Sequence, residues 1–246
     1  NISLPDVVFG CDITADNSTT YMSFFSQMDT YGDGYAGIGV WRAAFKPLVD
    51  RIADTDIRLQ WFCCDRSTGV TDASGNRITL IRDTQSPVAV EYQAVKFIGT
   101  GRDNIKAGVF SGWELGDYIY LRSEEAYMIK MEALAHKGSA EAVTELNSFM
   151  KTRQPDYNYT FTNKADLIEE IIYQKRVEFW GEGLEYIDNR RLNIPLDRTD
   201  ETWGAENNNH FSAAKFRYNQ EERPFLYQLP ISEIENNSQI SPSDQN

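Results

Sequence analysis

The sequence predicts a mainly α fold: a tetratricopeptide-like helical hairpin, further helices, long irregular loops and one or two small β-hairpins. Three observations support this fold class. Apolar residues recur at helical spacing in three consecutive segments between Tyr118 and Arg191. The same segments carry residues that are typical of helix starts and ends. Elsewhere, Gly- and Asn-rich stretches separate short apolar runs, which is typical of loops and short strands.

The first two of these segments are predicted to form a hairpin of antiparallel helices. The first helix is expected from Tyr118 to Lys137, and Gly138 is expected to end it as a C′ glycine. Ser139 is expected to cap the second helix. Apolar residues of the second helix fall on one face, namely Ala142, Val143, Leu146, Phe149 and Met150. A helix pair joined by a Gly-Ser turn is tetratricopeptide-like, although a single pair is not a repeat array.

The third segment combines an apolar face with dense charge. Asn163 is expected to cap this helix, which is predicted to continue through Gln174 to Gly183 and to lead into residues 186–191. Charges placed among Phe, Trp, Val and Ile are tolerated inside a protein only if they are paired. The expected pairs join a cation to a carboxylate, with Arg176, Arg190 or Arg191 on one side and Glu178, Glu182 or Asp188 on the other.

Four motifs follow one another in the second half of the chain. Residues 122–133 read Arg-x-x-Glu-x-Tyr-Met-Ile-x-x-Glu-Ala, and residues 142–153 read Ala-x-x-x-Leu-Asn-x-Phe-x-x-x-Arg. Residues 176–191 read Arg-x-Glu-Phe-x-x-Glu-Gly-x-x-x-x-Asp-x-x-Arg, and residues 225–234 read Phe-Leu-Tyr-Gln-Leu-Pro-Ile-Ser-Glu-Ile. In this order the motifs resemble the C-terminal half of the SusD/RagB family, whose members are surface-exposed, lipid-anchored glycan-binding proteins of Bacteroidetes.

The resemblance implies a fold, a function and a partner. It implies a SusD-like protein that binds an oligosaccharide or polysaccharide at the cell surface and hands it to a SusC-like TonB-dependent transporter in the outer membrane. Residues 1–246 are then one C-terminal region of this family, with a loop-rich part (1–117), a helical core (118–192) and an irregular tail (193–246). The lipoprotein signal and large N-terminal half that normally precede this region are not seen in the sequence.

The sequence departs from the family pattern at two places within the third helix and after it. Gln174 stands where the family usually has Glu, and Leu184-Glu185 replaces a usual basic residue. Both changes concern the ion pairs and leave the predicted fold intact.

Charge and composition disfavour several classes of function. The formal net charge of −13 argues against a nucleic-acid partner, because phosphate binding needs clustered Lys and Arg. The three cysteines lack the spacing of a zinc site, and His136 and His210 are badly placed for a metal or a triad, so no metal and no cofactor are expected. No apolar run approaches the length of a membrane-spanning helix. Membrane attachment is therefore expected only through a lipid anchor outside this chain.

Aromatic residues in Gly- and Asn-rich loops are the candidates for glycan binding. Sugar rings have apolar C–H faces that stack on an aromatic ring, while Asn, Asp, Gln and Arg hydrogen-bond the hydroxyl groups. The stretch 29–42 combines aromatic residues with Asp29, Asp33 and Arg42. Taken singly, each aromatic residue is more often a packing residue. The predicted glycan-binding residues are Tyr21, Tyr31, Tyr35, Trp41 and Trp203.

Two other functions remain open from the sequence. Glu178 and Glu182 lie four residues apart on one helix face, and a glycoside hydrolase uses a pair of carboxylates. Neighbouring cations would keep both groups ionised, whereas a general acid needs a raised pKa. The second alternative is a tetratricopeptide-type adaptor that grips a peptide or a partner protein, and it predicts more copies of the hairpin. A binding protein without enzymatic activity is therefore the favoured reading.

Overall fold

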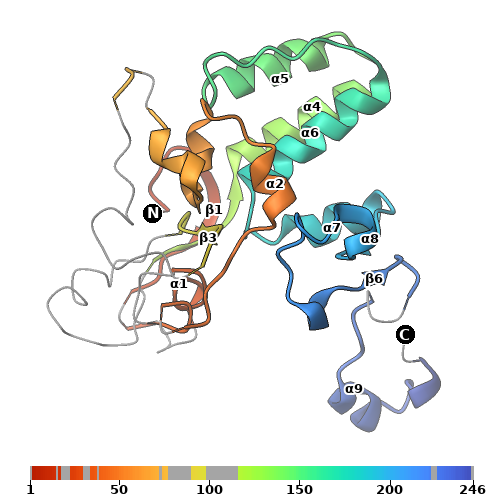
Figure 1. Ribbon diagram of the computed structural model, residues 1–246. Coiled ribbons are helices and arrows are strands. Elements are labelled where there is room, and N and C mark those ends of the chain that lie inside the picture. The colour runs from red at the N-terminus through yellow and green to blue at the C-terminus, as the bar shows by residue number, and fades with distance from the viewer. Residues whose placement is uncertain are drawn as a thin grey trace, which may run out of the picture. The chain divides into compact units, whose positions relative to one another are not determined.

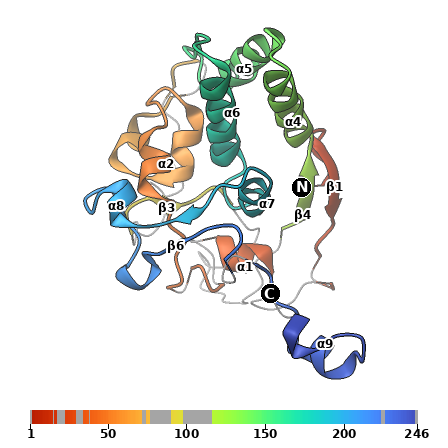
Figure 2. The same cartoon turned by 90° about the vertical axis from the view of Figure 1, so that its right-hand side faces the viewer.

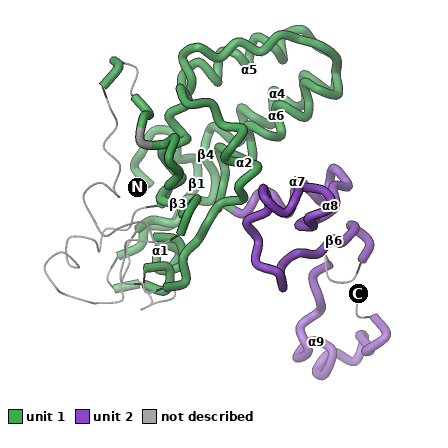
Figure 3. The backbone as a smooth tube through the Cα atoms, in the orientation of Figure 1, with its two compact units in different colours: residues 1–182 green, residues 183–246 purple. Residues whose placement is uncertain are grey.

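A computed structural model describes residues 2–14, 16–17, 23–29, 34–37, 39–71, 74–76, 90–97, 116–222 and 226–244. The chain divides into two compact units, residues 1–182 and residues 183–246 (Figure 3). Helices make up most of the regular structure, so the mainly α fold class predicted from the sequence is confirmed.

The three longest helices of the described residues lie together in the first unit, at the top of Figure 1. They are α4 (Ser123–His136), α5 (Glu141–Lys151) and α6 (Lys164–Glu178). Helix α4 packs against both α5 and α6. Gly138 ends α4 with a φ of +72°, a conformation that residues with a side chain rarely adopt. The predicted hairpin and the third helix are therefore confirmed.

The apolar faces of α5 and α6 follow the predicted spacing. Asn163 is the N-cap of helix α6, and its side chain accepts a hydrogen bond from the backbone N–H of Asp166 (3.0 Å). The helix ends at Glu178, short of the predicted Gly183, because two glycines with positive φ follow it. The buried residues of α5 are Ala142, Leu146, Phe149 and Met150, and those of α6 include Leu167, Ile171, Ile172 and Val177.

The predicted start of the first helix is wrong. Residues Tyr118–Arg122 form strand β4, which pairs antiparallel with β1 (Val7–Cys11), and α4 begins only at Ser123 (Figure 2). Aromatic and β-branched residues favour a strand once a partner strand is available. That partner lies far away in the sequence, so the local pattern could not reveal it.

The other elements of the first unit are short. They are α1 (Phe24–Met28), α2 (Lys46–Asp50), the 3₁₀ helix η1 (Ile57–Trp61), β2 (Phe62–Cys63), the 3₁₀ helix η2 (Asp65–Gly69) and β3 (Gln93–Ala94). Strands β2 and β3 pair antiparallel. The residue pattern predicts a hairpin in which a turn at 72–76 joins strands over residues 59–62 and 77–81. Its first strand is wrong, since most of residues 59–62 belongs to η1, and its second strand lies outside the described residues.

An apolar cluster joins these short elements to helix α6. Val49 of α2, Leu59 of η1 and Phe62 of β2 pack in the same buried cluster as Val177 of α6. The three cysteines are predicted to be packing residues; Cys63 and Cys64 are buried free thiols, as predicted, but Cys11 is exposed, so the prediction is wrong for it. Burial of this cluster holds the segment between α2 and η2 against one side of α6.

The second unit contains further short elements. They are α7 (Leu184–Arg191), β5 (Leu196–Asp197), α8 (Asp200–Trp203), the 3₁₀ helix η4 (Ser212–Ala214), β6 (Arg217–Tyr218), α9 (Ile231–Asn236) and the 3₁₀ helix η6 (Pro242–Asp244). Strands β5 and β6 pair antiparallel. The stretch 193–209, predicted to be one long irregular loop, therefore contains a strand and a helix. Asp197 helps to form this regular structure, because it accepts hydrogen bonds from the hydroxyls of Thr199 and Thr202 (2.8 and 2.7 Å).

Candidate functional site

The loop after α1 presents two of the predicted glycan-binding residues to solvent. Tyr35 is 42% exposed and Trp41 is 43% exposed. The loop between them is closed by a hydrogen bond from the backbone N–H of Val40 to the carbonyl oxygen of Tyr35 (3.1 Å). We call residues 34–42 the aromatic loop; residue 38 within it is not described.

Hydrogen bonds to Ser26 of α1 hold the backbone of the aromatic loop in place. The backbone N–H of Ala36 donates to the Ser26 carbonyl oxygen (2.9 Å), and that of Tyr35 donates to Ser26 Oγ (3.4 Å). Gly34 permits this close approach, because a Cβ at this position would lie 2.5 Å from Ser26 Cα. The backbone is therefore held against α1 while the Tyr35 and Trp41 side chains stay accessible.

The polar groups expected beside these rings are only partly available. Asp29 is fully buried, so the prediction that it would meet a sugar hydroxyl is not supported. Arg42, the next residue after Trp41, is partly exposed and donates a hydrogen bond to Gln27 Oε1 (3.4 Å). Asp33 lies outside the described residues.

The remaining predicted glycan-binding residues are not brought into the aromatic loop by any described contact. Tyr21 and Tyr31 lie outside the described residues. Trp203 ends α8 in the second unit, where its ring N–H donates to the carbonyl oxygen of Asp197 (3.0 Å) and its side chain is partly exposed.

Glu178 sits at the centre of a buried ion-pair network. Arg153 contacts its carboxylate through Nε and Nη2 (2.8 and 3.1 Å), and Arg58 Nη1 lies 3.4 Å from Oε2. Arg122 Nη1 lies 3.6 Å from Oε1. Burial alone would raise the pKa of Glu178, but the hydrogen bonds and charge of Arg153, with the charges of Arg58 and Arg122, lower that pKa to about 2.

Glu182 belongs to the same network. Its carboxylate accepts hydrogen bonds from Lys96 Nζ (2.6 Å) and from Arg122 Nη2 and Nε (2.9 and 3.0 Å). Of the pairs predicted for the carboxylates of this region, that of Arg191 with Asp188 (2.7 Å) is found. Both glutamates are thus paired with cations from distant segments. The lowered pKa of Glu178 makes this residue unsuited to a general acid.

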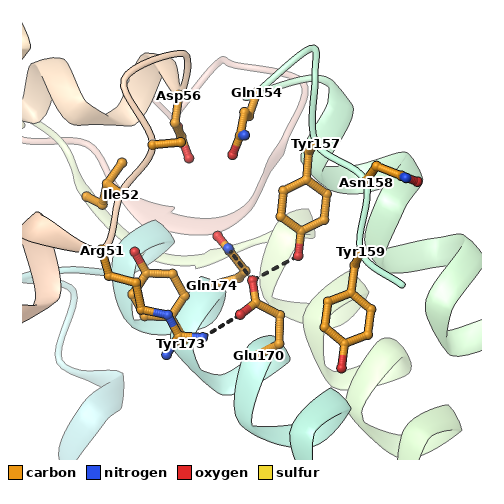
Figure 4. A pocket seen from close by; sticks show the side chains of 11 residues that line it. Arg51, Ile52, Asp56, Gln154, Tyr157, Asn158, Tyr159, Glu170, Tyr173 and Gln174 are labelled. Atoms are coloured by element: carbon orange, nitrogen blue, oxygen red, sulfur yellow. Dashed lines mark hydrogen bonds and ion pairs between the residues drawn. The ribbon is translucent and has the colours of Figure 1, made fainter. Parts of the chain in front are cut away.

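A cavity of about 370 Å³ opens beside helix α6, and none of the predicted glycan-binding residues lines it. It is lined by residues after α2, by the loop after α5 and by one face of α6 (Figure 4). Glu170 Oε1 accepts hydrogen bonds from the Tyr157 hydroxyl (2.8 Å) and Gln174 Nε2 (2.7 Å), and Oε2 accepts from Arg51 Nη2 (2.5 Å). The Arg51 guanidinium also stacks on the ring of Tyr173, 3.9 Å from its centre.

The described residues contain neither a cluster suited to a metal ion nor a helix suited to span a membrane. Among them, no group of three or more His, Cys, Asp and Glu side chains is arranged to hold a metal ion. In the same part of the chain, none of the helices combines the length and the apolar character needed to cross a membrane.

Comparison with known families decides the relationship. The description of the SusD family matches residues 92–246. The chain belongs to the SusD family. The match covers helices α4, α5 and α6, three of the residues that surround the Glu178 carboxylate or pair with Glu182 (Lys96, Arg122 and Arg153), and the second unit. Arg58 lies before the match, which begins after the aromatic loop.

Solved structures extend the likeness of this SusD-family chain to its first part. A SusD-like carbohydrate-binding protein from Bacteroides vulgatus ATCC 8482 matches with a TM-score of 0.66 and 18% identity, over 98% of this chain and 49% of that one. A protein from the same organism described as sugar-binding matches with a TM-score of 0.59 and 20% identity, over 98% and 45%. The chain thus spans about half the length of both structures. At these identities the likeness concerns the fold alone, and no curated protein matches the sequence.

Proposed function

We propose that this protein binds an oligosaccharide or polysaccharide at the bacterial cell surface and delivers it uncleaved to a SusC-like TonB-dependent transporter. One observation carries the proposal: a chain of the SusD family exposes Tyr35 and Trp41 on a loop whose backbone is held against α1. Attachment to the outer membrane through a lipid anchor is part of the proposal.

Stacking explains how the aromatic loop binds a glycan. An exposed aromatic ring offers an apolar face to the C–H groups of a sugar ring, and burial of the two surfaces removes both from water. Arg42 follows Trp41 in the sequence and is hydrogen-bonded to Gln27, and these two residues are proposed to supply donors and an acceptor for sugar hydroxyls. Tyr21 and Tyr31 precede this loop closely in sequence and are proposed to add further rings. Trp203 is proposed as a separate contact on the second unit.

The proposed function is binding without catalysis. Glycoside hydrolysis needs one carboxylic acid that gives up a proton and one carboxylate that attacks or activates water. Glu178 is nearly fully buried and its pKa is lowered to about 2, so it is a carboxylate under working conditions. Glu182 is occupied by Lys96 and Arg122. The pair therefore serves to hold the fold together.

Calorimetric titration of the chain with a panel of soluble oligosaccharides tests the proposal, with release of reducing ends followed in the same samples. We expect saturable heat with at least one glycan class and no release of reducing ends. Absence of heat with every glycan would overturn glycan binding by this chain. Release of reducing ends that disappears in Glu182→Gln would establish a hydrolase instead.

A further inference from the structure

The cavity beside α6 is well suited to a ligand of its own. We propose that it is a subsite for one neutral pyranose ring, such as the sugar unit at the end of a glycan chain. The inference rests on the proposed glycan-binding function, and it assigns to that function a second place which shares no residue with the aromatic loop. The volume of about 370 Å³ falls within the range typical of small-molecule sites, roughly 300–1,000 Å³.

Charge pairing within the cavity favours a neutral ligand. Arg51 is paired with Glu170 (2.5 Å), and Asp56 is paired with Arg58 (2.7 Å). Each of the three charged side chains that line the cavity therefore has a partner of opposite charge, which for Asp56 is Arg58 outside the lining. A charged ligand would lose hydration on entry without gaining an unpaired counter-charge, whereas a sugar hydroxyl needs only hydrogen-bond partners.

Polar groups of the cavity are held in place before any ligand binds. The Glu170 carboxylate has roughly four lone-pair positions, and Arg51, Tyr157 and Gln174 occupy three of them. A sugar hydroxyl can donate to the fourth position. Because these three contacts already fix the carboxylate, the loss of side-chain freedom on binding is small.

Aromatic rings supply the complementary apolar surface. Tyr157 and Tyr159 lie on one side of the cavity, and Tyr173 lies across from them, fixed by the stacked Arg51 (Figure 4). The backbone of Tyr159 is held by Asn147 of α5, which accepts from its N–H (2.7 Å) and donates to its carbonyl oxygen (3.0 Å). Rings and fixed polar groups around one small space match the C–H faces and the hydroxyl edge of a pyranose.

Substitution at Ala53 tests the subsite, since this residue lines the cavity and a larger side chain there would fill it. We would follow the amide spectrum of the ¹⁵N-labelled chain on addition of D-glucose, D-galactose, D-mannose and N-acetyl-D-glucosamine, and of a soluble oligosaccharide. For at least one neutral probe, we expect saturable shifts at residues 51–56 and 154–159. The affinity obtained from these shifts should fall at least tenfold in Ala53→Phe. It should stay unchanged in the matched control Ala126→Phe, because Ala126 is an exposed residue of α4.

A second variant and charged probes complete the test. Tyr157→Phe keeps the ring but frees one lone pair of Glu170, so the affinity should change while the fold is retained. D-Glucosamine and D-glucuronate should bind at least tenfold more weakly than the best neutral sugar. The inference is overturned if a saccharide shifts amide signals of the aromatic loop but not those of residues 51–56 and 154–159. The proposed function survives that result. If no saccharide shifts any residue, both fail.

Discussion

Arg58 and Glu178 face each other at 3.4 Å, with side chains only 1% and 4% exposed, although 120 residues separate them in the sequence. Arg58 belongs to η1, which follows α2, and Glu178 is the last residue of α6. The pair therefore joins the segment after α2 to the end of α6. Two more arginines contact the same carboxylate: Arg122 of β4, and Arg153, which follows α5.

Removal of this carboxylate should destabilise the fold strongly. In Glu178→Gln the three arginines lose their shared buried counter-charge, and breaking a buried pair in this way costs about 3–5 kcal/mol of unfolding free energy. Urea denaturation followed by circular dichroism measures the loss. The matched control is Glu169→Gln on the same helix, whose exposed pair with Arg51 contributes less than about 1 kcal/mol. Equal losses in the two variants would contradict the structural role of Glu178.

The same carboxylate should make stability depend on acid pH. The pKa of Glu178 is lowered from an ordinary 4.5 to about 2 in the folded protein. A lowered folded pKa gives a stabilisation that is fully present above the unfolded value and is lost as the pH falls towards the folded value. The difference in unfolding free energy between wild type and Glu178→Gln should therefore be largest at about pH 5 and should shrink by about pH 3. A constant difference over this range would show that the pKa is not lowered.

Two glycines offer a matched test of close packing after α6. Gly138 and Gly181 have similar positive φ values, +72° and +79°. A Cβ at Gly138 would meet no atom within 4 Å, whereas one at Gly181 would lie 2.7 Å from the ring of Phe97 and 2.8 Å from Met28. We expect Gly138→Ala to cost about 1–2 kcal/mol from backbone strain. Gly181→Ala should cost about 1–3 kcal/mol more, because the neighbours must move. Equal midpoints of thermal unfolding would refute the contact.

The parts of the fold that depend on local pattern could be predicted from the sequence. Helices α5 and α6 follow from apolar spacing, and the caps at Gly138 and Asn163 follow from residue type, because each signal lies within a few residues. Strand β4 was missed because its partner β1 lies at the other end of the first unit. Aromatic residues at 118–120 read equally well as the start of a helix until that partner is known.

The candidate site was harder to predict, since its contacts join distant segments. Sequence reasoning gave Glu178 neighbouring arginines as partners, but the actual partners come from η1, β4 and the end of α5. The cavity beside α6 likewise needs three separate segments. A local signal did exist in the Tyr157-Asn158-Tyr159 run, where two rings and an amide stand together in a loop. Such a run forms a cavity only together with other segments, here the segment after α2 and helix α6.

The aromatic loop gives the most direct test of glycan binding. Tyr35→Ala and Trp41→Ala should each lower the affinity for the best glycan by about 0.5–1.5 kcal/mol, or about two- to tenfold, because each removes one stacking face. Both residues are exposed, so the unfolding midpoint should stay close to that of wild type. Tyr120→Ala on β4 is the matched control, since this exposed tyrosine contacts Phe9 outside the loop. Calorimetric titration of the three variants decides the matter: unchanged affinity in both loop variants would remove the loop from the site, and a loss shared by Tyr120→Ala would point to a general change in the fold.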